Sequence, residues 1–75
     1  MKTDPEIIQK LEQAVNEDVY RVEPEDRNDY YNIIDCSGIP LDDDIFEGLS
    51  DEEIDHYNDI LYGTIVVKEL NNYFS

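Results

Sequence analysis

The spacing of apolar residues predicts a helix near the start of the chain. Apolar side chains recur every three or four positions over residues 7–15, which places them on one face of a helix. Thr3 or Asp4 can cap its first turn. The pattern supports a helix to about residue 16, and it could continue toward Pro24, which stops it in either case.

The next segment is compatible with two secondary structures. We expect two antiparallel strands, at residues 19–23 and 29–36, joined by a polar turn at 24–28. The second of these stretches is rich in aromatic and β-branched residues and poor in helix formers. A short helix over residues 25–35 is the alternative.

A second helix is marked by a capping box. Ser50 can cap the helix, while the Glu53 side chain returns to the backbone N–H of Ser50. We expect this helix to run to Tyr62 and to stop at Gly63. Three of its side chains are expected to face inward: Ile54, Tyr57 and Leu61.

The chain after this helix predicts a third strand, because residues 64–67 include four β-branched residues in succession. A helix is the alternative, since apolar residues after position 65 also recur at helical spacing. The expected fold is therefore α+β: one domain over residues 1–75, with an N-terminal helix, a short antiparallel sheet of about three strands and a second, acidic helix. The alternative is an all-α bundle of three to four helices.

Of all features of the sequence, the net charge limits the possible ligands and partners most. The sequence has 20 acidic and 5 basic residues, a formal charge of −15, and no Lys or Arg occurs over residues 28–67. Such an excess of like charge opposes folding into a compact domain. It also excludes nucleic acid and anionic membranes as direct ligands, because phosphate binding requires Lys and Arg. A basic, nucleic-acid-binding protein is the expected partner, and a homodimer is compatible with the small core of so short a chain.

The sequence gives little support for catalysis or a cofactor. His56 and Cys36 are the only residues of their types, and the three glycines are isolated rather than grouped in a phosphate-binding loop. A single cysteine cannot form an internal disulfide. Because the residue types for catalysis are scarce, we expect that the protein is not an enzyme. The chain has no signal-peptide pattern and no apolar run near 20 residues, so we expect it in the cytoplasm.

Residues 42–53 share the length of an EF-hand loop and three of its carboxylate positions: Asp42, Asp44 and Glu53. Phe46 stands where an oxygen ligand belongs, and Glu47 stands where the loop requires glycine. We therefore predict no metal site, and weak calcium binding remains a minor alternative.

The acidic residues of the second helix form an ordered row. Asp51, Asp55 and Asp59 repeat every four residues, so their side chains follow one helix face at steps of about 6 Å. A second acidic group consists of residues 42–44 and Glu47, and a third lies at residues 23–29. Tyr20 precedes the third group, and we expect its side chain to be exposed. The predicted partner-binding residues are Asp51, Glu52, Asp55, Asp59, Tyr62, Asp42, Asp43, Asp44 and Glu47.

These features predict an acidic inhibitor that mimics nucleic acid, with carboxylates in place of phosphates and aromatic side chains as apolar anchors. In composition and size the chain resembles the small DNA-mimic proteins of phages and mobile elements, which block DNA repair, restriction or CRISPR enzymes. The alternative is an immunity protein or antitoxin that neutralises a basic nuclease, a role that the pair Tyr30 and Tyr31 would suit. A soluble adaptor subunit is a further hypothesis.

Overall fold

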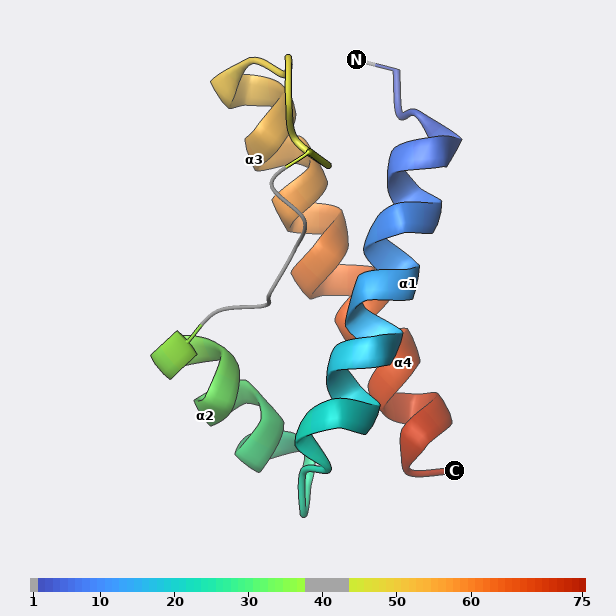
Figure 1. The fold of residues 1–75 in the computed structure, drawn as a ribbon, viewed down its shortest axis with the longest axis vertical. Helices are drawn as coiled ribbons and strands as arrows, with labels where there is room; N and C mark the ends of the chain where they lie inside the picture. Colours follow the sequence, from blue (N-terminus) through green and yellow to red (C-terminus); the bar gives the residue numbers. More distant parts are fainter. Residues whose placement is uncertain (1, 38–43) are drawn as a thin grey trace.

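A computed structural model describes residues 2–37 and 44–75, and every regular element in these ranges is helical. The elements are α1 (Pro5–Val22), α2 (Arg27–Ser37), α3 (Asp51–Ile60), the π-helical turn η1 (Leu61–Ile65) and α4 (Val66–Tyr73). Figure 1 shows that α3, η1 and α4 form one long helix, which runs in the same direction as α1 and packs on it through η1 and α4. The described residues thus fit the all-α alternative, and the predicted α+β fold with a three-stranded sheet is wrong.

The predicted strand at residues 19–23 belongs instead to α1. Asp4 caps this helix as expected, since its Oδ1 accepts the N–H of Glu6 at 2.9 Å. Val15 and Val19 are both buried and lie four residues apart, so they share the helix face that packs on the core. Burial of this face outweighs the β-propensity of valine, which is a weak local preference. The helix then ends at Glu23, whose backbone is left-handed with φ 48°.

The predicted strand at residues 29–36 is also wrong, because this stretch forms α2. Its first turn is fixed by Asp26, whose Oδ1 accepts the N–H of Asp29 at 2.7 Å. Tyr30 and Ile34 lie one helical turn apart and are both buried. A strand would direct the side chains at these positions to one side as well, but the capped first turn favours the helix.

The second predicted helix start is confirmed. The Ser50 hydroxyl accepts the N–H of Glu53, and the Glu53 carboxylate accepts the N–H of Ser50, each at 3.2 Å. Tyr57 and Leu61 are buried as expected. Tyr57 also holds the start of the chain, because its Oη accepts the backbone N–H of Asp4 at 2.8 Å.

The predicted stop at Gly63 and the predicted strand at residues 64–67 are wrong, since the helix continues through η1. The N–H of Val66 bonds to the carbonyl of Leu61, five residues back, which is the π-helical pattern. Tyr57, Leu61 and Ile65 are buried at steps of four residues, and Val66, directly after Ile65, starts a second buried step of four to Leu70. The π-helical turn lies where the buried series moves on by one residue, and both η1 and α4 pack against α1.

Replacing Gly63 with alanine should raise the free energy of unfolding by about 0.5–1 kcal/mol. A Cβ at this position would meet no atom within 4 Å, and alanine is favoured over glycine inside a helix. Gly48→Ala is the matched control and should lower stability, because Gly48 has φ +79°, where a side chain is strained. Chemical denaturation of both variants measures the difference, and equal effects would show that helix continuity at Gly63 is misassigned.

The core lies between α1 and the long helix and also receives side chains from α2 and from the turn at residues 44–48. Its buried apolar members are Leu11, Val15, Val19, Tyr30, Ile34, Ile45, Tyr57, Leu61, Ile65, Val66 and Leu70.

Candidate functional site

The acidic row of α3 lies at the surface, as its spacing predicts. Asp51, Asp55 and Asp59 are all exposed, and Glu52 beside them is exposed too. We refer to these four residues as the α3 carboxylate face. Its carboxylates repeat at steps of about 6 Å along the helix.

Within the described residues, no ion pair involves the α3 carboxylate face. Neither α3 nor η1 contains Lys or Arg. Within residues 2–37 and 44–75, two ion pairs form: Arg21 with Asp18 on α1, and Lys68 with Glu12 between α4 and α1. Both lie outside this face.

The second predicted acidic group is described only in part. Asp44 and Glu47 are exposed in the turn that precedes Ser50. Figure 1 shows this segment against the start of α3, so the two side chains add to the acidity at that end of the molecule. Asp42 and Asp43 lie outside the described residues.

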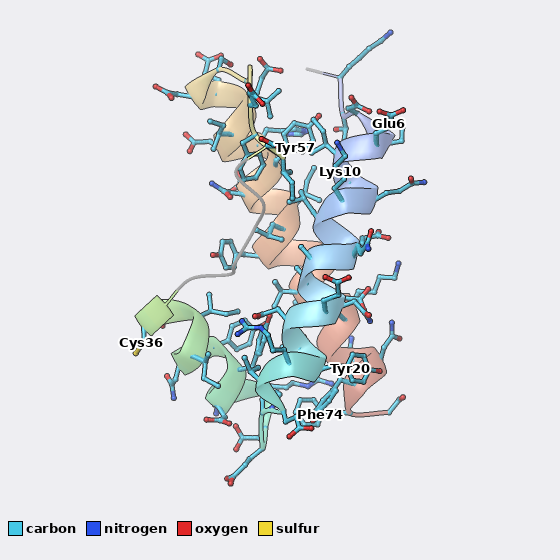
Figure 2. The ribbon with its side chains drawn as sticks, viewed as in Figure 1. Glu6, Lys10, Tyr20, Cys36, Tyr57 and Phe74 are labelled. Carbon is cyan, nitrogen blue, oxygen red and sulfur yellow. The ribbon has the colours of Figure 1, made fainter. Side chains whose placement is uncertain are left out.

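Two tyrosines that were expected at the surface are exposed. Tyr62, on η1 and about one helical turn beyond Asp59, retains 43% of its accessible surface, and Tyr20, on α1, retains 56%. Tyr62 thus remains available as an apolar contact next to the α3 carboxylate face. Tyr20 lies at the other end of the molecule (Figure 2).

A buried polar cluster escaped the sequence analysis. Asp18 is only 3% exposed, and its carboxylate accepts hydrogen bonds from the Tyr30 hydroxyl at 2.6 Å and from Arg21 Nη2 at 2.5 Å. The bond from Tyr30 links α2 to α1, and the two bonds together satisfy a charge that would be costly to bury alone. Burial of Tyr30, followed by its hydrogen bond to Asp18, raises the pKa of its hydroxyl well above the ordinary value of 10. The only local signal was the spacing of Asp18 and Arg21.

The raised pKa of Tyr30 predicts a loss of stability in alkali. The native state keeps the Tyr30 proton above pH 10, whereas the unfolded chain releases it, so the free energy of unfolding should fall as pH rises beyond 10. The slope should approach about 1.4 kcal/mol per pH unit. Tyr30→Phe should be less stable at neutral pH by about 1–3 kcal/mol, because the Asp18 carboxylate loses a donor.

Denaturant titrations between pH 7 and 11 test this prediction, with Tyr31→Phe as the control because Tyr31 is only half-buried. Tyr30→Phe should lack the fall in the free energy of unfolding above pH 10 that wild type and Tyr31→Phe share. Parallel pH profiles for all three proteins would contradict it.

The EF-hand-like stretch is organised differently from a calcium loop where it is described. Glu53 is engaged by the N–H of Ser50, and the half-buried Phe46 ring lies 6.5 Å from the ring of Tyr57. Within the described residues, no group of three or more His, Cys, Asp or Glu side chains could hold a metal ion. Asp42 and Asp43 are outside this comparison, so calcium binding stays untested.

His56 and Cys36 do not form the hydrogen-bonded pair that nucleophilic catalysis needs. His56 Nε2 lies 2.8 Å from the hydroxyl of Thr3. Cys36 is exposed at the far end of α2, and Figure 2 places it away from Tyr57, the chain neighbour of His56.

A hollow of about 420 Å³ separates α1 from the turn at residues 44–48. Side chains of both charges line it: Lys10, Gln13, Ala14, Glu17, Asp18, Arg21, Asp44 and Ile45. Because Arg21 is held by Asp18 and both carboxylates and cations surround the space, it favours neither an anion nor a cation.

The described helices include none with the length and apolar character that crossing a membrane requires. Comparisons of the chain with protein families, with curated proteins and with solved structures found no match.

Proposed function

We propose that this chain is a protein-binding inhibitor whose α3 carboxylate face occupies the basic, nucleic-acid-binding surface of a target protein. The observation that supports this proposal is the row of exposed Asp51, Asp55 and Asp59 on one helix face, none of which forms an ion pair within the described residues. Its step of about 6 Å is of the same order as the spacing of phosphates along a nucleic-acid strand.

The row is better explained by binding than by folding. Like charges four residues apart destabilise a helix, so the arrangement opposes the stability of α3. On a basic target the same charges would speed association and displace the ions that the target's Lys and Arg side chains attract. Tyr62 would add apolar contact beside the charged row.

The immunity-protein hypothesis loses the surface feature that favoured it. Tyr30 is fully buried and its hydroxyl bonds to Asp18, so the adjacent tyrosines do not form an exposed pair. We therefore develop the mimic hypothesis alone. Its target would be met in the cytoplasm, the location that the sequence predicts.

The test begins with the immobilised chain in a cell lysate at low salt, followed by stepwise elution with salt. The basic protein recovered is bound to labelled duplex DNA or RNA, and the chain is titrated into that complex. A mimic should displace the nucleic acid completely, with an apparent affinity that falls in proportion as more nucleic acid is added. Affinity should also drop steeply between low and high salt, because exposed charges are screened over about 8 Å at physiological ionic strength.

A stable ternary complex of chain, target and nucleic acid would exclude mimicry while leaving charge-driven binding intact. Affinity that does not change with salt would exclude both, and would favour an adaptor whose acidic surface serves solubility.

A further inference from the structure

Three aromatic rings meet at the surface where α1 and α4 end. The ring of Tyr20 lies edge-on to that of Tyr73, with centroids 5.3 Å apart, and the ring of Tyr73 lies edge-on to that of Phe74 at 4.8 Å. Tyr20 and Phe74 retain 56% and 36% of their accessible surface. We name these three residues the aromatic cluster. Figure 2 places Tyr20 and Phe74 together, at the end of the molecule opposite Glu6.

The aromatic cluster borders an open hollow with acidic walls. The hollow measures about 510 Å³ and is lined by Phe74 and by the segment that joins α1 to α2: Glu25, Asp26, Arg27 and Asn28. Hydrogen bonds fix the shape of this segment, since Asp29 Oδ2 accepts the N–H of Glu25 at 3.0 Å and Asp26 Oδ1 accepts the N–H of Asp29 at 2.7 Å. The backbone of the segment that lines the hollow is therefore held in place.

The charge around this hollow is negative. The chain from residue 23 to 29 carries four carboxylates, at Glu23, Glu25, Asp26 and Asp29, against the single cation Arg27. None of the four takes part in an ion pair within the described parts of the chain. A cation from outside would therefore find the partly exposed Phe74 ring and the carboxylate of Glu25, which forms no ion pair within the described residues, at one place.

We propose that the aromatic cluster and the adjoining carboxylate of Glu25 bind an arginine side chain of a protein partner. The guanidinium group is planar and weakly hydrated, so it can stack on a ring while its N–H groups bond to a carboxylate. Lysine offers only a compact, strongly hydrated charge. A second copy of this chain is the poorer occupant, because each copy carries a charge of −15.

This site does not depend on the α3 carboxylate face. The longest dimension of the molecule is 35 Å, and Figure 1 shows the start of α3 at one end and the ends of α1 and α4 at the other. A failure of the inhibitor proposal would leave the arginine site standing, and the reverse also holds.

The test uses the full ¹⁵N-labelled chain and a synthetic probe, a glycine-rich peptide with two arginines, compared with the same peptide with two lysines. Addition of the arginine peptide should shift the amide resonances of Tyr20, Asn28, Tyr73 and Phe74. It should bind about three- to tenfold more tightly than the lysine peptide, the range that ring stacking of a guanidinium contributes.

Substitutions separate stacking from simple charge attraction. Phe74→Leu and Tyr20→Leu keep apolar bulk but remove a ring. Each should lower the affinity for the arginine peptide about three- to tenfold. Glu25→Gln should lower the affinity for the arginine peptide, whereas Arg27→Gln should raise this affinity by removing the competing cation. Glu6→Gln, at the opposite end, makes the same charge change as Glu25→Gln and should have little effect. Thermal melting verifies that each variant is folded.

Three results would overturn the proposal. The first is peptide-induced shifts confined to α3. The second is equal affinity of wild type, Phe74→Leu and Tyr20→Leu for the arginine peptide. The third is a shift of the aromatic-cluster resonances with protein concentration alone, which would identify a second copy of the chain as the occupant. With Asn at Asp51, Asp55 and Asp59, the shifts at the aromatic cluster should persist.

Discussion

Replacing Leu11 with alanine should remove a large part of the stability of this domain. Leu11 lies at the centre of α1, is 0% exposed and belongs to the core between α1 and the long helix. Leucine-to-alanine changes at such sites cost about 2–5 kcal/mol, because they remove contacts and leave a cavity. Domains have only about 0.05–0.15 kcal/mol of stability per residue, so a chain of this length has little in reserve.

Val67→Ala provides the control for this experiment. Val67 lies on α4 of the long helix that packs against Leu11, but it is 37% exposed, so alanine there should lower the free energy of unfolding by less than about 1 kcal/mol. Urea denaturation at neutral pH gives both values. If the two substitutions cost the same, the core does not lie between α1 and the long helix.

The helix starts were predictable because their signals are local. The Asp4 cap and the reciprocal bonds of Ser50 and Glu53 each involve residues within one turn. The exposure of the α3 acids was predictable for the same reason, since helical periodicity fixes which residues share a face.

The strands were wrongly predicted because β-propensity was given more weight than the local Asp26 cap of α2, and because other deciding contacts are distant in sequence. Val19 and Tyr30 have side chains that favour strands, but both are buried in a helical core. Tyr30 is held by Asp18, twelve residues earlier, and no local pattern indicates that an aspartate is buried there. Tertiary burial therefore decides the secondary structure of the segment that joins the two long helices.

The π-helical turn was unpredictable for a related reason. A break was predicted from Gly63 and from the β-branched residues at 64–67. The helix instead continues through a widened turn, and η1 and α4 both pack against α1, a tertiary contact that no local pattern indicates. Part of the aromatic cluster was not predicted either: Tyr20 was expected at the surface, but the packing of Tyr73 against Tyr20 and Phe74 was not.

Changing Asp51, Asp55 and Asp59 together to asparagine should weaken target binding on the order of 100-fold at low salt. If each carboxylate contributes even about 1 kcal/mol on a basic target, three of them account for roughly two decades in affinity. Folding should be little affected, because all three side chains are exposed and repel one another along α3. The loss of Asp51 from the first turn should offset part of the relieved repulsion, since acids there favour the helix dipole. We therefore expect a free energy of unfolding within about 1 kcal/mol of wild type.

The matched control removes the same charge elsewhere, through Glu6→Gln, Glu17→Gln and Asp35→Asn on α1 and α2, where all three side chains are exposed. Both triple variants carry the same net charge, so non-specific attraction to a basic target falls equally in the two. Titration calorimetry against the target recovered from the lysate, at two salt concentrations, gives both affinities. The α3 variant should lose most of the salt dependence of binding, whereas the control should keep it because the salt-sensitive contacts remain in place. Equal losses in the two variants would mean that binding depends on total charge, and the α3 carboxylate face would then be no more than one part of an evenly acidic surface.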